Sequence, residues 1–530
     1  MRTAYDVFKK CTAGFYVLLM SAMLVLLLIF QPFLNYMCKK SFLQPNAVLL
    51  LLALLLSILL TKAIWKKQRR VEHALMCSSH SNILLGCVIL LFVQVTICCN
   101  TYFVSGWDSG MVLSQAYRLA SGESMDVSYF SQYPNNLLLL WFYSLIFRAC
   151  FAFGVTEMIL GTYVILVIQC VISTVTGFLL YDLCLHFTRS YIISFSSWLY
   201  YAVFIGISPW LLIPYSDSMG LIFPVLLLWL YQKQRKSKKR WAIWLLMGLV
   251  TAIGYRIKPQ IVIMTVAIIL VEIFAAFQNG RQKARILPLL KYIMLLASAA
   301  VVTQAVCTAF LIPATRMEGL DSKRSFGPTH FLMMGLNDKK DGVYYEPDVE
   351  FSASFDTPAQ RERANMNVVA ERLRNYGCAG LLKHLAKKSL VNYGDGTFAW
   401  GAEGSFYLQL LPDGDNLLSP LLKQILYNNG KYYAYFSSIE QALWLLLLFA
   451  ALCSAPFMWK KRNCQTLLTA VLSMVGLTVF ELLFEARARY LYIYTPVLIF
   501  IGAVGWNCFY EAIENILTKR GYRTRNKFFL

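Results

Sequence analysis

The sequence predicts an all-α, polytopic membrane protein, and three observations support this prediction. Of its 530 residues, 58% are hydrophobic and only 15% are charged, and the mean hydropathy is +0.54. This composition is unlike that of a soluble globular domain. Apolar runs long enough to cross a bilayer as helices recur along the whole chain. Short basic loops and one long polar segment separate these runs.

About twelve membrane-spanning helices are expected from the apolar runs. The first run is too long for a cleavable signal and has no small-residue cleavage site, so we expect it to stay as the first span. The expected spans are 11–36, 46–65, 82–103, 157–185, 191–211, 220–231, 241–255, 261–277, 286–313, 436–458, 465–484 and 490–509.

The distribution of charge predicts the orientation of these spans. Basic residues cluster in short loops and in the tail, at 66–70, 233–240, 281–285, 460–462 and 519–527. The positive-inside rule places such clusters in the cytoplasm. The long segment 315–435 differs, since it contains 14 basic and 14 acidic residues and is therefore neutral. We expect this segment on the opposite, extracytoplasmic side.

One further apolar run, 136–154, is long enough to cross but does not fit this orientation. If it crossed, every later loop would change sides, and the basic loop 233–240 would lie outside. We therefore expect a re-entrant or interfacial helix, a placement that suits its Trp141 and Arg148. The segment 104–156 then forms one large outer loop.

These boundaries predict four regions. The outer domain is expected to be small and mixed, with the clearest helical pattern at 358–390. The regions are an N-terminal two-span extension at 1–81, a membrane core at 82–314 that includes the outer loop 104–156, an extracytoplasmic domain at 315–435, and the C-terminal spans with a basic cytoplasmic tail at 436–530.

Two acidic residues are expected at the outer edge of the membrane. Asp108 lies in Gly106-Trp107-Asp108-Ser109-Gly110, just beyond the end of the third span. Asp217 follows the fifth span in the same way. A charged carboxylate beside a bilayer is costly unless it has a partner or a function. Both residues are therefore candidates for catalysis.

Cations are expected at the same level. Arg256 and Lys258 follow the seventh span, and Glu485, Arg487 and Arg489 follow the eleventh. Because basic residues are depleted on the outer side of membranes, these cations are candidates for holding an anion. Single cations at helix ends are otherwise common, since they reach from the bilayer toward water. Glu485 alternatively pairs with one of the two arginines, which leaves the other free.

This set of groups suits transfer from a lipid that carries a phosphate. Arginine and lysine hold phosphate oxygens, arginine through its two-pronged guanidinium. A carboxylate can take the proton of an attacking hydroxyl as a general base, and cations stabilise the charge that develops on a leaving phosphate. In the outer domain, His330 and the aromatic segment 392–401 suit contact with a sugar or, alternatively, an interfacial aromatic belt.

The chain resembles the GT-C superfamily of integral membrane glycosyltransferases, in particular bacterial relatives of protein O-mannosyltransferases and aminoarabinose transferases. The resemblance covers about 82–509 and rests on Asp108 in the first large outer loop, on Tyr133-Pro134-Asn135-Asn136, on Asp217 and on the late outer domain. Three features depart from that pattern: two spans, the extension at 1–81, precede the span that leads into the Asp108 loop, Ser109 follows Asp108 where a second acid is common, and no Pro-Pro or Lys-Pro precedes Asn135.

The resemblance implies that Asp108 activates the acceptor, that Asp217 is a second acidic site residue, and that the donor is a polyprenyl-phosphate sugar. The residues expected to bind substrate, from this resemblance and from chemistry, are Tyr133, Arg256, Lys258, His330, Glu485, Arg487 and Arg489.

The sequence thus predicts a hexosyl or pentosyl transferase of the cell membrane, with its site on the extracytoplasmic face. The acceptor is expected to be a lipid, glycan or protein of the cell envelope. No cofactor is expected, and a divalent metal stays open. The alternatives are a polysaccharide polymerase or ligase, and a transporter of lipid-linked sugars, whose polar groups would lie mid-membrane. The excess positive charge fits topology and anionic lipids rather than nucleic acid.

Overall fold

The computed structural model describes residues 4–30, 42–277, 282–317, 319–414, 416–461 and 464–519. Most of these residues lie in helices, which confirms the all-α prediction. The α-helices are α1 (Ala4–Ile29), α2 (Asn46–Lys66), α3 (Gln68–Cys77), α4 (Ser79–Thr101), α5 (Trp107–Ser121), α6 (Val127–Gln132), α7 (Leu137–Ala152), α8 (Met158–Thr188), α9 (Tyr191–Tyr201), α10 (Ser216–Gly220), α11 (Ile222–Gln234), α12 (Arg240–Ile257), α13 (Val262–Ala276), α14 (Gln282–Ala314), α15 (Pro328–Gly335), α16 (Glu346–Ala353), α17 (Pro358–Tyr393), α18 (Leu418–Leu426), α19 (Tyr433–Leu452), α20 (Ala455–Lys460), α21 (Gln465–Leu483) and α22 (Thr495–Lys519).

Seven short helical turns connect these helices. They are η1 (Pro134–Asn136), η2 (Ala202–Gly206), η3 (Pro209–Leu212), η4 (Pro259–Ile261), η5 (Ser322–Arg324), η6 (Trp400–Gly404) and η7 (Ala488–Tyr494). The expected end of the first span at Tyr36, together with Arg281, Arg462 and the tail beyond Lys519, lies outside the described residues.

Among the described residues, ten helical segments are long and apolar enough to cross a membrane. Nine of them coincide with expected spans. The expected spans at 191–211, 220–231 and 241–255 form the shorter helices α9, α11 and α12. A straight crossing needs about 20 helical residues, so crossing by these three remains a prediction.

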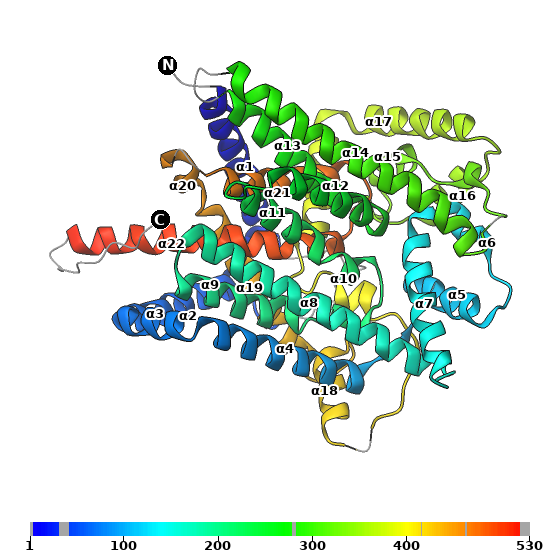
Figure 1. Ribbon diagram of the computed structural model, residues 1–530, viewed down its shortest axis with the longest axis horizontal. Coiled ribbons are helices and arrows are strands. Elements are labelled where there is room, and N and C mark those ends of the chain that lie inside the picture. The colour runs from blue at the N-terminus through cyan, green and yellow to red at the C-terminus, as the bar shows by residue number, and fades with distance from the viewer. Residues whose placement is uncertain are drawn as a thin grey trace.

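The tenth candidate segment is Pro134–Ala152, formed by η1 and α7. It corresponds to the run that was expected to lie in the membrane interface. Length and composition would permit it to cross. In Figure 1, however, α7 runs across the direction of α8 rather than alongside it. This orientation favours the interfacial placement, which stays a prediction.

Figure 1 shows the long helices gathered in a bundle, with α5, α6, α7, α15 and α16 at one end. The opposite end holds α3, α20 and the start of α1. Basic residues flank α3 at Lys67 and end α20 at Lys460. The bundle therefore separates these basic loops from the neutral segment, as the charge distribution predicts.

The segment 315–435 is mainly helical, and α17 confirms the predicted helix at 358–390. Its backbone breaks at Gly377, where φ is 54°, a conformation that glycine adopts without strain. The second half of the segment shares its core with the membrane helices. For example, the fully buried Trp400 packs edge-on against Trp210, and Trp444 of α19 donates to the carbonyl of Tyr393. This packing fixes the segment firmly against the bundle.

Two short strands form the sheet of the described structure. β1 (Phe103–Ser105) pairs antiparallel with β2 (Tyr407–Leu410), so that Phe103 lies opposite Leu410. β1 directly follows α4 and directly precedes the loop that carries Asp108. The strand pair therefore ties this loop to the segment 315–435.

Candidate active site

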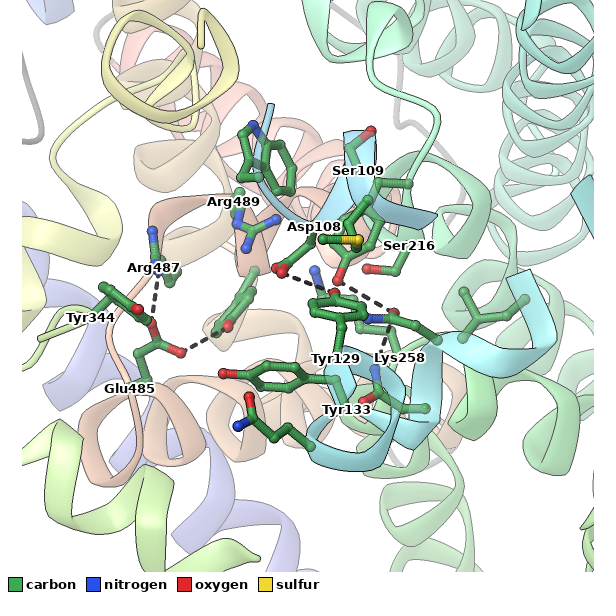
Figure 2. Close-up of a pocket in the computed structure, with 18 of the residues that line it drawn as sticks. Asp108, Ser109, Tyr129, Tyr133, Ser216, Lys258, Tyr344, Glu485, Arg487 and Arg489 are labelled. Carbon is green, nitrogen blue, oxygen red and sulfur yellow. Dashed lines mark hydrogen bonds and ion pairs between the residues drawn. The ribbon is translucent and has the colours of Figure 1, made fainter. Parts of the chain in front are cut away.

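A cavity of about 1580 Å³ lies at the end of the bundle, where α5 and α6 meet the ends of α12 and α21 and the segment 315–435 (Figure 2). Eight of the nine predicted site residues line it. They are Asp108, Tyr133, Arg256, Lys258, His330, Glu485, Arg487 and Arg489. The ninth, Asp217, is buried and does not line the cavity.

Asp108 occupies the first turn of α5 and is half-buried. The hydroxyl of Tyr129 donates to Asp108 Oδ1 at 2.9 Å. Tyr129 in turn accepts a bond of 2.8 Å from the amide of Asn136, whose Oδ1 accepts from Tyr215 at 3.3 Å. Within the described part of the chain, no ion pair reaches Asp108. Its carboxylate is thus oriented by a chain of neutral groups and faces the cavity.

The sequence around Asp108 explains how the loop reaches this position. A Cβ on Gly110 would lie 2.1 Å from the carbonyl oxygen of Ser105, so only glycine allows α5 to begin so close to β1. Trp107 adopts φ 43°, which is uncommon for a bulky residue. The guanidinium of Arg489 lies 4.7 Å from the centroid of this indole, and Tyr215 packs edge-on against it. These contacts hold the strained residue in place.

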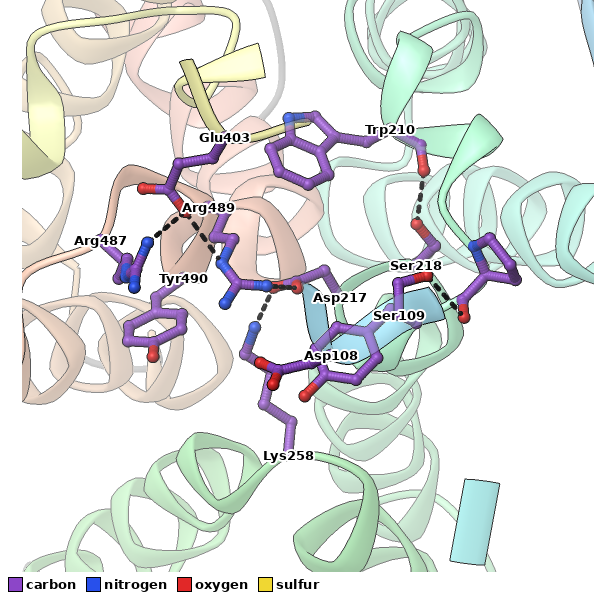
Figure 3. Close-up of polar contacts among 12 residues, drawn as sticks. Asp108, Ser109, Trp210, Asp217, Ser218, Lys258, Glu403, Arg487, Arg489 and Tyr490 are labelled. Carbon is purple, nitrogen blue, oxygen red and sulfur yellow. Dashed lines mark hydrogen bonds and ion pairs between the residues drawn. The ribbon is translucent and has the colours of Figure 1, made fainter. Parts of the chain in front are cut away.

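Asp217 corrects one prediction. Its side chain is 1% exposed and pairs with Lys258 and with Arg489, whose Nη1 lies 3.0 Å from Oδ2 (Figure 3). A carboxylate that is buried behind two cations cannot reach a substrate, and each of its oxygens already accepts from a cation. The catalytic role expected for Asp217 therefore does not fit its position. Its carboxylate instead pairs with both cations and offsets part of their charge, which would otherwise be costly to bury.

Arg487 and Arg489 share a partner that the sequence did not indicate. Glu403 Oε2 lies 3.0 Å from Nη1 of Arg487 and 3.2 Å from Nε of Arg489. Glu403 belongs to η6, in the segment 315–435, and also lines the cavity. No local pattern in Gly401-Ala402-Glu403-Gly404 distinguishes it from a turn residue. Its position follows only from the tertiary packing of η6.

Glu485 pairs with Arg487, as one of the sequence alternatives anticipated. Arg487 Nε donates to Glu485 Oε1 at 2.9 Å, and Tyr490 donates to Oε2 at 3.2 Å. The ammonium of Lys258 lies 4.6 Å from the centroid of the Tyr490 ring. The charged residues therefore form one connected network along a wall of the cavity.

Arg256 lines the cavity, but α14 already binds its guanidinium. Nε donates to the side chain of Gln304 at 2.7 Å, and Nη2 donates to the Gln304 carbonyl at 3.0 Å and to Thr308. This arrangement makes Arg256 less available to a phosphate than the predicted role requires.

The wall of the cavity that contains Tyr133 and His330 is aromatic. The Tyr133 ring centroid lies 5.2 Å from that of Tyr129 and 5.7 Å from that of Phe326. His330 stacks on Phe326 at 4.2 Å and shares a 2.7 Å hydrogen bond with Ser352 through Nδ1. Burial lowers the pKa of His330 to about 4, so the imidazole is neutral at physiological pH. Such a wall suits the faces of a sugar ring.

No group of three or more His, Cys, Asp or Glu side chains in the described residues is arranged to hold a metal ion.

Comparison with known proteins places the chain in a family. A family model described as "conserved hypothetical integral membrane protein" matches residues 4–509. The chain belongs to this family. It is therefore an integral membrane protein, as its ten candidate spans also indicate. No curated protein sequence matches the chain.

Two solved structures resemble the chain distantly. Both are the oligosaccharyltransferase of Archaeoglobus fulgidus, in one case AglB in complex with an inhibitory peptide and a dolichol-phosphate, and in the other the apo form. The identities are 12% and 13%, and the TM-score is 0.42 for each. The matches cover 85% and 84% of this chain and 53% of each archaeal chain, so the chain spans about half the length of those proteins. At this distance, the roles of the present side chains follow only from their own geometry.

Proposed function

We propose that the protein is a membrane glycosyltransferase of the GT-C type. In this proposal it moves a sugar from a polyprenyl-phosphate donor to an acceptor hydroxyl of the cell envelope, on the extracytoplasmic face of the membrane. The observation that carries the proposal is the meeting, in one cavity, of a group of three cations and a carboxylate that has no cationic partner among the described residues. Asp108 is that carboxylate, and Lys258, Arg487 and Arg489 are the cations.

Asp108 is proposed to act as the general base. It takes the proton of the acceptor hydroxyl while the hydroxyl oxygen forms a bond to the anomeric carbon of the sugar. The bond between that carbon and the phosphate oxygen breaks, and the phosphate keeps the electron pair. The hydrogen bond from Tyr129 orients the carboxylate without neutralising it. This surrounding supports a base rather than a counter-ion.

The cations are proposed to hold the donor phosphate and to stabilise the charge that it gains. Arg487 and Arg489 line the cavity and present planar guanidiniums, which suit phosphate oxygens. The cavity also has an apolar side, with Phe406 and Leu408 56% and 68% exposed. Such a side suits the lipid chain of the donor, and the aromatic wall at Tyr133 and His330 suits its sugar.

The decisive experiment gives the purified protein radiolabelled polyprenyl-phosphate sugars together with cell-envelope acceptors. The proposal expects the sugar to leave the donor and appear on an acceptor. Reconstitution in vesicles distinguishes the proposed transferase from a transporter, since a transporter would move intact donor between leaflets. Intact donor on both leaflets with no transfer to any acceptor would refute the transferase.

A further inference from the structure

The arginines proposed to hold phosphate already carry an anion. Glu403 Oε2 forms ion pairs with both arginines, 3.0 Å from Arg487 Nη1 and 3.2 Å from Arg489 Nε. The Glu403 side chain is only 10% exposed, and it lines the cavity. Figure 3 shows its carboxylate between the two guanidiniums. A carboxylate thus occupies the position that a donor phosphate would need.

The charged network is balanced without any ligand. Its cations are Lys258, Arg487 and Arg489, and the carboxylates paired with them are Asp217, Glu403 and Glu485. A phosphate that entered this wall would add negative charge next to carboxylates that are largely buried, where like charges repel more strongly than in water. One carboxylate must therefore give up its arginines before the phosphate can bind them.

Glu403 is the carboxylate that the network holds least well. Asp217 has two cations and is 1% exposed, while Glu485 binds Arg487 through one oxygen and Tyr490 through the other. Glu403 uses only Oε2, and its Oε1 is buried without a partner in the described part of the chain. An unpaired buried oxygen is unfavourable, so releasing this side chain costs less than releasing the others.

The backbone on both sides of the turn that carries Glu403 is held in place, so only this turn needs to change when Glu403 leaves the arginines. Before it, Trp400 is fully buried and donates to the Leu426 carbonyl. After it, β2 is paired with β1, and the Gly106 amide donates to the Phe406 carbonyl at 3.3 Å. Because Glu403 lines the cavity, rotation of its side chain into that space would leave both ends of its turn anchored.

We propose that Glu403 is a resident counter-ion that competes with the donor phosphate for Arg487 and Arg489. This inference rests on the proposed function. In the empty cavity Glu403 holds the two arginines, and it leaves them when a phosphate-bearing lipid binds. Because the product lipid carries a phosphate as well, the return of Glu403 also favours product release. Glu403 is thus a positioning residue that lowers the affinity for both lipids and speeds turnover.

The test measures the binding of a radiolabelled polyprenyl monophosphate to the purified full-length protein in nanodiscs. Glu403→Gln removes the competing charge and keeps the shape of the side chain, so the phosphate lipid should bind roughly tenfold more tightly. In steady state, E403Q should lower both the donor KM and kcat, since product release becomes slow. Glu485→Gln is the matched control. It also removes one negative charge, but both oxygens of Glu485 accept hydrogen bonds, so this variant should tighten binding less than about threefold. Equal or weaker binding by E403Q than by the wild type, or equal effects of the two variants, would overturn the inference.

Further arms separate this inference from the function on which it rests. If wild-type binding is lost in Arg487→Gln but is not strengthened in E403Q, only the competition is refuted. If the wild type does not bind the lipid, or binds it equally well in Arg487→Gln, the proposed phosphate site itself fails. Competition by inorganic phosphate tells whether the headgroup alone is recognised. Thermal unfolding checks that each variant folds, and Glu403→Asp, which keeps the charge but reaches less far, should show a smaller tightening if E403Q does not fold.

Discussion

Asp108 and Asp217 both follow an apolar helix, and both lie in the first turn of the helix that comes next. Their partners differ. Asp108 is half-buried, faces the cavity and accepts from the neutral hydroxyl of Tyr129. Asp217 is buried and paired with Lys258 and Arg489. Two acids in similar places in the sequence therefore have different chemistry available to them.

This difference indicates that the partner of a carboxylate, rather than its place at a helix end, determines whether it can act as a base or serves as a counter-ion. A carboxylate held by two cations is stabilised in its charged form and has little tendency to take a proton. A carboxylate held by neutral donors keeps a free face and can act as a base. Removing the first should therefore damage the fold, and removing the second should damage the reaction.

The largest expected effect is that of Asp108→Asn on the rate of sugar transfer. Asparagine keeps the shape but cannot take a proton, so kcat should fall about thousandfold or more. Protein yield and thermal unfolding should not change. Asp126→Asn is the matched control, because Asp126 is an exposed carboxylate of the same loop that caps α6 by accepting from the amide and the hydroxyl of Ser128. Full activity of D108N would exclude Asp108 as the base.

Asp217→Asn should act on stability instead. It leaves Lys258 and Arg489 buried without the negative charge of Asp217. Breaking a buried ion pair in this way lowers the free energy of unfolding by about 3–5 kcal/mol. Thermal unfolding and the yield of folded protein in detergent measure this loss. A variant that unfolds at the wild-type temperature but is inactive would show that Asp217 takes part in the chemistry after all.

A pH dependence extends the comparison to His330, which also faces the cavity and has a neutral partner in Ser352. Burial lowers its pKa to about 4, whereas an unfolded histidine has a pKa of about 6.5. Between these values the unfolded chain binds a proton that the folded protein does not, so stability falls as the pH drops from 6.5 toward 4. The loss reaches about 3 kcal/mol. His330→Gln should flatten this part of the stability profile, as measured by unfolding at pH 7 and at pH 4.5, and an unchanged slope would contradict the assignment.

The smallest expected effect is that of Tyr129→Phe. It removes one hydrogen bond to the Asp108 carboxylate, so kcat should fall about tenfold while the donor KM stays unchanged. Tyr133→Phe removes the hydroxyl of the neighbouring tyrosine and keeps its ring, so it serves as the control. A change in donor KM without a change in kcat would mean that Tyr129 binds the donor rather than orienting the base.

Hydropathy and charge placement predicted much of this molecule. Nine of the expected spans coincide with candidate spans, because a membrane helix is defined by a long local run of apolar residues. Assigning sides to the helix ends also gathered most of the site, since residues at the same end of a bundle lie close together. The prediction that Asp108, Lys258, Arg487 and Arg489 lie at the same end of the bundle agrees with the cavity that all four line, whereas their roles stay a prediction.

The partners within the site could not be predicted, because they depend on tertiary packing. Glu403 is far along the chain from Asp108 and lies in a turn that carries no pattern. Asp217 stands between Ser216 and Ser218, which suggests an exposed loop, yet all three residues are buried. Tyr129 is one of many tyrosines, and only the fold shows which of them reaches Asp108.

The pairing of β1 with β2 has a consequence for biosynthesis. The strand that precedes Asp108 ends at Ser105, whereas its partner begins at Tyr407. Translation proceeds at about 5–20 residues per second, so the early strand waits on the order of tens of seconds for the late one. During that interval the Asp108 loop is already outside the ribosome, but one wall of its cavity has not yet been synthesised. The cavity therefore stays incomplete until most of the chain has been inserted.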